Sequence, residues 1–282
     1  MKMKLQNETA IITGSTEGIG KAIAELLLSE GCKVAISSRS EVKVKRTLNE
    51  LKTKYGGSVI GYPCDVTKIE DLQRLVDKTI AAFGSIRILI ANAGINTKYG
   101  PFSCMSSAMV DENTKAILGV NLIGVMNTIA AVMPTMKNQN YGRIITFSGA
   151  GVDRPIDNMS IYSASKGGVV TFSECLALEF KENFEDIKIN IFQPGMIRTK
   201  LTTSVECVPN WKTSEDIKED VEFVLEYLGG DIKKSTKKII PFVLSKTKAN
   251  GKTFRGFSLF KLIIKAIKMQ RVLKKRKDKE LV

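Results

Sequence analysis

Residues 9–20 read Thr9-Ala10-Ile11-Ile12-Thr13-Gly14-Ser15-Thr16-Glu17-Gly18-Ile19-Gly20. The first part is a short apolar, β-branched run, which predicts a strand that stops at Gly14. From Gly18 to Ser29 apolar residues recur at helical spacing, so a helix follows the turn directly. Glycines at the end of a strand permit positive φ and let a ligand approach the backbone. The helix that follows presents free N–H groups and the positive end of its dipole, which suits a pyrophosphate.

The rest of the chain alternates between strand-like and helix-like stretches. Strands are predicted over residues 33–37, 59–62, 86–90, 143–147 and 188–192. Helices are predicted over residues 41–55, 68–83, 111–136 and 161–183. This alternation indicates βαβ units, and continuous apolar strands suit a parallel sheet that is covered on both faces. We therefore expect a Rossmann-like α/β fold, a doubly wound parallel sheet of six to seven strands with helices on both faces, plus a basic helical C-terminal extension.

The glycines of the first turn follow the spacing Gly-x-x-x-Gly-x-Gly. Such a pattern alone is also compatible with a simple tight turn. Here a strand precedes it, a helix follows it, and a second strand lies about twenty residues further on. We therefore predict a dinucleotide-binding turn formed by Gly14, Ser15, Thr16, Glu17, Gly18, Ile19 and Gly20.

The end of the second strand bears on the choice of cofactor. A fold of this kind that prefers NAD usually places an acidic residue here for the ribose 2′-hydroxyl. This chain has Ser38, Arg39 and Ser40 instead. A guanidinium pairs well with a 2′-phosphate, and serine hydroxyls add hydrogen bonds, so NADP is favoured over NAD. Two observations weigh against this: Arg39 is compatible with a solvated loop, and a carboxylate at Glu17 would repel a phosphate.

Tyr162 and Lys166 open the last of the predicted helices. The i, i+4 spacing places the phenol and the ammonium on one helix face. A nearby cation stabilises phenolate and is expected to lower the tyrosine pKa from its usual value of about 10 toward neutrality. Such a tyrosine can exchange a proton with a carbonyl or alcohol oxygen. The pair alone is common by chance, but here it follows a nucleotide turn and a strand that ends at Ser148.

Taken together, these motifs resemble those of the short-chain dehydrogenase/reductase family in its shorter form. The similarity runs from about Leu5 to Thr199 and continues more weakly to about Leu228. Seven motifs occur in the family's order: Thr13-Gly14-x-x-x-Gly18-Ile19-Gly20, Asp65-Val66, Asn92-Ala93-Gly94, Asn121, Ser148, Tyr162-x-x-x-Lys166, and Pro194-Gly195 with Thr199.

The resemblance implies a role for each matching residue. Tyr162 would be the general acid/base, and Lys166 would lower its pKa and hold the nicotinamide ribose. Ser148 would bind the carbonyl oxygen, and Asn121 would hold a water in a proton relay. The cofactor-binding residues would further include Asp65 and Val66 at adenine, Asn92, Ala93 and Gly94 at the adenosine ribose, and Pro194, Gly195, Ile197 and Thr199 at the nicotinamide.

The serine departs from the family's usual spacing. That serine normally stands thirteen residues before the tyrosine, where this chain has Gly149, and Ser148 stands fourteen before. We assign the role to Ser148 on the basis that the loop Ser148-Gly149-Ala150-Gly151 carries one extra residue. The alternative is that Ser148 is only a strand-end hydroxyl and that Ser160 or a water binds the oxygen.

Composition limits the chemistry of the chain. There is no histidine, which excludes a Ser-His-Asp triad and a histidine-ligated zinc site. The five cysteines are odd in number and widely spaced, so we expect reduced thiols in a cytoplasmic protein and no metal site. The N-terminus lacks the features of a secretory signal, and no apolar run reaches the roughly 18–20 residues that span a bilayer.

The positive charge is concentrated at the C-terminus. The net charge is +14, and residues 246–282 account for +11 of it, with 13 basic and two acidic residues. Residues 257–277 form a helical pattern in which Lys261, Lys265, Lys268 and Arg271 share one face. Such a helix suits the surface of an anionic membrane, but it could instead pack its apolar side on the body or on another subunit. Nucleic-acid binding has no supporting motif. We therefore expect one domain over residues 1–256, with a possible insertion at 231–250, and a basic amphipathic extension over 257–282.

These observations predict an NADP-dependent oxidoreductase that interconverts a small carbonyl compound and an alcohol. The alternative is a non-catalytic sensor or scaffold protein that binds a dinucleotide in the same fold. The substrate would be selected by the loops at residues 95–110, 150–160 and 200–213. In the family, the helices that correspond to 111–136 and 161–183 pack against their copies, which implies a homodimer or homotetramer.

Overall fold

A seven-stranded parallel sheet forms the centre of the molecule. The computed structural model describes residues 3–204 and 206–280, and the side chains among them up to residue 273. From one edge to the other, the strands are β3 (Val59–Pro63), β2 (Lys33–Ser38), β1 (Thr9–Ile12), β4 (Ile88–Ile90), β6 (Gly142–Phe147), β7 (Ile187–Gln193) and β9 (Thr253–Arg255). The seven strands agree with the upper number expected from the sequence, and the fold is the expected doubly wound α/β type.

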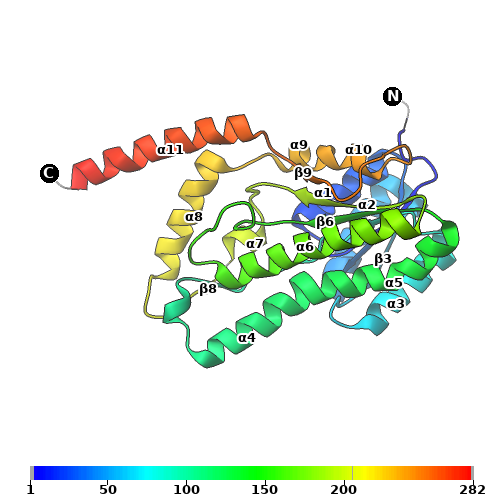
Figure 1. Ribbon diagram of the computed structural model, residues 1–282, viewed down its shortest axis with the longest axis horizontal. Helices are drawn as coiled ribbons and strands as arrows, with labels where there is room; N and C mark the ends of the chain where they lie inside the picture. Colours follow the sequence, from blue (N-terminus) through cyan, green and yellow to red (C-terminus); the bar gives the residue numbers. More distant parts are fainter. Residues whose placement is uncertain (1–2, 205, 281–282) are drawn as a thin grey trace.

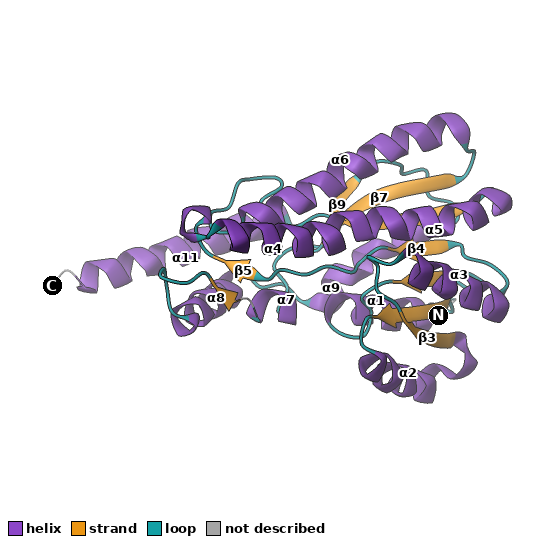
Figure 2. Ribbon diagram, turned by 90° about the horizontal axis from the view of Figure 1, so that it is seen from below, coloured by secondary structure: helices purple, strands orange, loops and turns teal. Residues whose placement is uncertain are grey.

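Helices cover both faces of this sheet (Figures 1 and 2). One face packs on α3 (Ile69–Phe83), α5 (Gly124–Gln139) and α6 (Ser160–Asn183), and the other on α1 (Gly18–Ser29), α2 (Glu41–Tyr55) and α10 (Ile240–Val243). On that second side α9 (Ile232–Thr236) packs against α1. The five inner strands, β2, β1, β4, β6 and β7, are buried at their apolar positions, whereas the edge strands β3 and β9 are only partly buried. Ile11, Ile12, Leu89 and Ile90 are at most 1% exposed. Burial on both faces explains why these strands read as continuous apolar runs.

The order of the strands creates a crevice at the carboxyl edge of the sheet. From β1 the chain runs outward to β2 and β3, then returns to β4 on the other side of β1. Loops after β1 and β4 therefore leave in opposite directions. In doubly wound sheets such a reversal point is where ligands bind.

The long helix predicted over residues 111–136 is three consecutive pieces. It begins earlier than predicted with α4 (Ser107–Leu118), passes through a π-helical turn, η3 (Gly119–Ile123), and continues as α5 to Gln139. Among the described helices, the stretch Ser107–Gln139 is long and apolar enough to cross a bilayer, but half of its most apolar window is buried inside the protein. Packing against α3 and the sheet accounts for that apolar character.

The segment after β7 contains elements that the sequence pattern did not predict. These are α7 (Lys200–Thr203), β8 (Glu206–Cys207), α8 (Ser214–Leu228), α9, η4 (Lys237–Ile239) and α10; β8 pairs with β5 (Lys98–Tyr99), which lies after β4, in a separate two-stranded sheet. Two further 3₁₀ turns are η1 (Gly56–Ser58) and η2 (Phe102–Cys104). Residues 231–250, expected as a possible insertion, contribute Ile239, Ile240 and Val243 to the core on the α1 side.

The chain ends in the expected basic helix. After β9, the last strand of the sheet, α11 (Leu259–Glu280) runs outward from the body past the end of α8 (Figure 1). Its root is fixed because Phe257 packs on Gly195, where an added Cβ atom would lie only 2.7 Å from the Phe257 ring.

Candidate active site

The glycine-rich turn after β1 is shaped by close backbone contacts. Gly14 and Gly18 have φ values of +63° and +57°, which side chains rarely adopt. A Cβ atom on Gly20 would lie 2.3 Å from the carbonyl oxygen of Gly14 and 2.5 Å from Asn92 Nδ2. Only glycine at position 20 lets α1 begin this close to the strand.

Side chains from the neighbouring loop hold the turn in place. Asn92 Nδ2 donates to the carbonyl oxygens of Thr13 (3.0 Å) and Gly14 (2.9 Å), and the Ala93 N–H donates to Thr13 Oγ1 (3.2 Å). Ser15 is fully buried, and its hydroxyl donates to Ile12 O (2.7 Å). The side chains of Asn92 and Ser15 therefore shape the turn itself, which adds a structural role to the cofactor contacts expected of these two residues.

The geometry of the turn fits a dinucleotide. The N-cap residue of α1, Glu17, makes no side-chain cap, so the first N–H groups of the helix are not blocked by it. Unpaired N–H groups at the start of a helix are the usual partners of a phosphate. Gly18 lies under Thr199, whose Cγ2 atom would be 3.3 Å from a Cβ atom at that position. The turn and the loop after β7 thus enclose one space.

Charged groups surround this space on the β2 side. Arg39 is exposed at the end of β2, and Ser40 caps α2 by accepting from Lys43 N (3.3 Å). The Glu17 carboxylate pairs with Lys43 Nζ (3.2 Å) and Lys200 Nζ (3.3 Å). Burial raises the pKa of Glu17, but these two cations outweigh that effect and hold the pKa below its usual value. The repulsion expected between Glu17 and a phosphate is therefore offset by two lysines.

The residues expected to contact adenine, Asp65 and Val66, lie in the loop after β3. Asp65 Oδ1 accepts hydrogen bonds from Thr67 N (3.0 Å) and Thr67 Oγ1 (2.8 Å). Burial raises the pKa of Asp65, but the bonds from Thr67 and the charge of Arg39 keep it below its usual value overall. Val66 is 3% exposed and packs against Gly124 of α5, so its side chain faces the core.

Tyr162 and Lys166 lie together in a buried position on the first turns of α6. They are 7% and 5% exposed, and Lys166 Nζ is 6.0 Å from the centroid of the Tyr162 ring. Burial raises the pKa of Tyr162 to about 12 and lowers the pKa of Lys166 to about 8. The expected lowering of the tyrosine pKa is therefore wrong for the chain on its own, because loss of hydration disfavours both charged forms.

Asn121 sits in the π-helical turn, fully buried. Its Oδ1 accepts from Ile95 N (2.8 Å), and its Nδ2 donates to Ile95 O (2.9 Å) and Ser165 Oγ (3.1 Å). Asn121 therefore ties the loop after β4 to α6. A Cβ atom on Gly94 would lie 3.3 Å from Asn121 Oδ1 and 3.5 Å from Lys166 Nζ, so all three residues converge.

The loop after β6 lies close against the first turns of α6. A Cβ atom on Gly149 would lie 2.8 Å from Lys166 Cγ and 2.9 Å from Tyr162 Oη. Gly151 is equally close to α6, since a Cβ atom there would be 2.0 Å from Ser163 Oγ. The position thirteen residues before the tyrosine thus has no room for a side chain, and Ser148, 4% exposed, is the adjacent hydroxyl.

The segment after β7 borders the crevice on the side opposite the loop after β3. Gly195 has a φ value of +84°, Ile197 is buried, and Thr199 caps α7 with Thr202. Ser235 Oγ donates to Pro194 O (2.8 Å), which anchors the turn on α9. The expected nicotinamide-side residues therefore border the same crevice as the glycine-rich turn.

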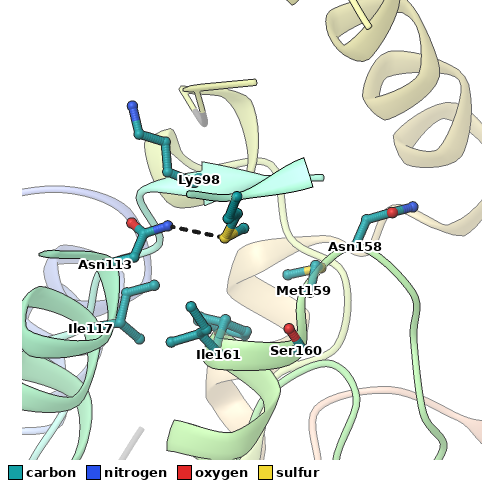
Figure 3. Close-up of a pocket in the computed structure, with 9 residues that line it drawn as sticks. Lys98, Asn113, Ile117, Asn158, Met159, Ser160 and Ile161 are labelled. Carbon is teal, nitrogen blue, oxygen red and sulfur yellow. Dashed lines mark hydrogen bonds between the residues drawn. The ribbon is translucent and has the colours of Figure 1, made fainter. Parts of the chain in front are cut away.

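A small pocket opens beside Tyr162 (Figure 3). Ile161 and Ser160 of α6 face Ile117 and Asn113 of α4 across it, and the complete lining is Lys98, Met105, Asn113, Ile117, Asn158, Met159, Ser160, Ile161 and Tyr162. A second pocket of about 280 Å³ shares Lys98 and Asn113. The first pocket is lined by α4, α6 and the loops at 95–110 and 150–160, and the second adds Ser204 and Glu206 from the loop at 200–213.

Backbone pairing ties the three substrate loops to one another. β5 and β8 pair in parallel, and Lys98 forms an ion pair with Glu206 across them. The Gly100 N–H donates to Asn158 O (3.0 Å), and the centroids of the Tyr99 and Trp211 rings lie 5.7 Å apart. Sequence reasoning missed this sheet, because two-residue strands carry no periodicity.

Several contributing residues were also missed. Lys43, Lys200 and Ser165 act through partners distant in the sequence, and the α4 pocket residues look like ordinary core positions. A usable signal existed for Lys200, since it directly follows Thr199. Among the side chains that the structure describes, in residues 3–204 and 206–273, no group of three or more cysteine, aspartate or glutamate residues is placed to hold a metal ion.

Comparison with known proteins identifies the family. A family model described as short chain dehydrogenase matches residues 8–207. Dehydrogenase/reductase SDR family member 4 of Sus scrofa is 34% identical over 198 residues, covering 70% of this chain and 68% of that protein. An uncharacterized oxidoreductase of Staphylococcus saprophyticus is 31% identical over 228 residues, covering 79% of this chain and 93% of that protein.

Solved structures share the fold. Levodione reductase superposes with a TM-score of 0.77 at 24% identity, over 89% of this chain and 96% of that one. NAD⁺-bound xylitol dehydrogenase superposes with a TM-score of 0.76 at 23% identity, over 89% of this chain and 98% of that one. The chain belongs to the short-chain dehydrogenase/reductase family. It is an NAD(P)-dependent oxidoreductase.

Proposed function

We propose that this chain is an NADP-dependent oxidoreductase that interconverts a carbonyl compound and an alcohol, with Tyr162 as the general acid/base. The observation that carries the proposal is the buried pair of Tyr162 and Lys166, which converges with Gly94, Asn121 and Gly149 at the switch point of the sheet. A pocket lined partly by Tyr162 adjoins this pair. Buried titratable groups in a cleft are typical of catalytic sites.

Each residue has a specific task in the reaction. When bound, the nicotinamide exchanges a hydride with the substrate carbon. Tyr162, whose pKa is about 12, stays protonated at neutral pH and donates its proton to the substrate oxygen during reduction. Ser148 donates a hydrogen bond to the same oxygen and stabilises its developing negative charge. Lys166 holds the ribose and stabilises the phenolate once Tyr162 has given up its proton.

The polar residues around the adenine ribose support NADP over NAD. Arg39, Lys43 and Lys200 are cations on this side of the crevice, and Glu17 is already paired with the two lysines. A 2′-phosphate would meet the Arg39 guanidinium, a charge-assisted contact that a ribose hydroxyl cannot provide.

The alternative, a dinucleotide-binding sensor without turnover, predicts a different outcome in one assay. The purified protein would be incubated with NADPH or NADH and a panel of aldehydes, ketones and dicarbonyl compounds, and absorbance would be followed at the nicotinamide band. The proposed enzyme oxidises NADPH faster than NADH with at least one carbonyl class. Tight NADPH binding without oxidation by any member would instead support the sensor.

The serine assignment is testable in the same assay. Ser148→Ala should lower kcat by about 10²–10³ if its hydroxyl stabilises the oxyanion. Ser160→Ala is the matched control, because Ser160 lies at the pocket and is the competing hydroxyl. A larger loss in Ser160→Ala than in Ser148→Ala would transfer the role to Ser160.

We also propose a homodimer or homotetramer in the cytoplasm. Leu178 on α6 is 68% exposed and Ile123 in η3 is 50% exposed, which suits contact between copies along these helices. The odd number and wide spacing of the five cysteines suit a reducing compartment. Leu178→Glu should reduce the mass measured by light scattering, and an unchanged mass would place the contact elsewhere.

A further inference from the structure

The helix α11 presents an unpaired apolar face. Leu262, Ala266, Met269 and Val272 are partly covered, and α8 is the helix that α11 packs against. The opposite side carries large apolar side chains in solvent, with Phe260 74% and Ile263 57% exposed. The full exposed set is Leu259, Phe260, Ile263, Ile264, Ile267 and Leu273. So many exposed large apolar residues on one helix mark a contact surface.

A basic stripe borders this apolar face. At 100° per residue, Lys261, Lys265 and Lys268 fall within one narrow sector beside the exposed apolar residues, and all three are exposed. Lys265 Nζ donates to Gly229 O (2.9 Å), which holds the stripe between the apolar face and α8. The sequence of α11 continues with Lys274, Lys275, Arg276 and Lys277.

The basic region extends onto the body of the protein. α9 and η4 carry Lys233, Lys234, Lys237 and Lys238, all exposed, and Figure 1 shows α9, α10 and the root of α11 along one edge of the molecule. Residues 231–282 contain 17 basic and three acidic residues, a net charge of +14 that equals the charge of the whole chain. The remaining 230 residues are therefore neutral overall, and the positive field belongs to this edge.

The neighbouring helix α8 carries six acidic residues, and three of them are paired with cations outside α11. Glu215 pairs with Lys218, Asp220 with Lys212, and Glu222 with Arg198. These carboxylates are thus engaged by cations outside α11.

We infer that the edge formed by α9, η4 and α11 binds the surface of an anionic phospholipid bilayer. The exposed apolar residues of α11 enter the headgroup boundary, while the lysines of α9, η4 and α11 contact the anionic headgroups. A second copy of the chain is disfavoured as the occupant, because it would bring two strongly positive edges together. A nucleic acid would use the cations but would leave the apolar face of α11 uncovered. This inference stands independently of the proposed reaction.

Vesicle sedimentation tests the inference on the full chain. Vesicles of phosphatidylcholine with 30% phosphatidylserine would be compared with phosphatidylcholine alone, at low and high salt. We expect binding to the anionic vesicles that falls by at least tenfold on pure phosphatidylcholine or in high salt, since each cation at an anionic surface is worth about a fivefold gain.

Two variants separate the apolar and ionic contributions. Phe260→Ser/Ile263→Ser/Ile267→Ser should reduce binding by at least about tenfold, and so should Lys261→Gln/Lys268→Gln. The matched controls are Val42→Ser on α2, 78% exposed, and Lys52→Gln/Lys78→Gln, which should bind within about twofold of the parent. Circular dichroism verifies that each variant is folded.

Three outcomes would overturn the inference. The first is no binding to anionic vesicles, and the second is binding that neither α11 variant reduces. The third is evidence for a different partner. Contact with a second copy is indicated if the apolar triple variant lowers the mass of the protein in solution without vesicles. A nucleic acid is indicated if a single-stranded RNA 20-mer binds more tightly than vesicles and binds the triple variant as well as the parent.

Discussion

The two regions that meet at the carboxyl edge of the sheet are held in different ways. The glycine-rich turn and the Tyr162–Lys166 pair are buried, and the contacts around them leave no space for an added Cβ atom at Gly20 or Gly149. The segment from Met196 to Gly230 reaches the same crevice through exposed ion pairs, such as Lys200 with Glu17 and Arg198 with Glu222.

The two kinds of contact indicate which side of the site is rigid and which side can adapt. Close packing and buried hydrogen bonds fix the geometry in which a proton and a hydride must be exchanged. Exposed ion pairs contribute little to stability and exchange partners easily. We therefore expect the Tyr162 side of the crevice to be rigid and the Lys200 side to be adjustable, so variants in the two regions should differ sharply in effect.

The largest effect is expected at Gly20. Gly20→Ala places a Cβ atom 2.3 Å from Gly14 O and should destabilise the fold by about 3 kcal/mol and abolish NADPH binding. Urea unfolding and fluorescence titration measure the two effects. Gly57→Ala, where an added Cβ atom meets nothing within 4 Å, is the control and should change neither. Equal behaviour of the two variants would show that the turn is not tightly packed.

A pH-dependent effect is expected at Lys166. Its folded-state pKa of about 8 lies below the usual value of 10.5, so its contribution to stability is fully present above 10.5 and is lost as pH falls through 8. From pH 7 to pH 9.5 the parent should gain stability over Lys166→Met by on the order of 2 kcal/mol. Urea unfolding of both proteins at the two pH values gives this difference, and a pH-independent difference would contradict the burial of a titrating lysine.

A smaller effect is expected at Arg39, which is exposed. Arg39→Ala should weaken NADPH binding by about tenfold or more and leave NADH binding within twofold. Arg46→Ala is the control, since Arg46 lies on the neighbouring helix α2 with its guanidinium 3.9 Å from Glu50. Equal losses for both cofactors would remove the 2′-phosphate assignment.

The smallest effect is expected at Lys200. Lys200→Gln removes an exposed ion pair with Glu17, so stability should change by less than about 0.5 kcal/mol and NADPH affinity by no more than about threefold. Denaturation and titration measure both. A loss of stability or affinity as large as that of Gly20→Ala would mean that the Lys200 side of the crevice is as rigid as the Tyr162 side.

Much of the fold could be predicted because the signals were local. The helix over 41–55 begins and ends where predicted, and the strand-like runs became buried parallel strands with boundaries shifted by one or two residues. The order of the motifs located Gly14–Gly20, Tyr162 and Lys166. Such features depend on periodicity and on glycine conformation, which are visible in the sequence.

What could not be predicted depends on contacts between distant residues. The pairing of Lys98 with Glu206, the hydrogen bonds from Asn92 to the turn, and the close approach of Gly149 to Tyr162 join segments far apart in the chain. The pKa of Tyr162 was misjudged for the same reason, because spacing reveals a neighbouring cation but not the loss of hydration.

The most direct test of the account is single-turnover reduction of a carbonyl substrate by Tyr162→Phe at neutral pH, with NADPH affinity measured on the same preparation. Tyr141→Phe is the control, because the Tyr141 hydroxyl is buried and has no hydrogen-bond partner among the described residues. The account predicts a rate about 10²–10⁴ lower in Tyr162→Phe at unchanged NADPH affinity, with Tyr141→Phe matching the parent. A Tyr162→Phe rate equal to that of the parent, at equal affinity, would contradict it.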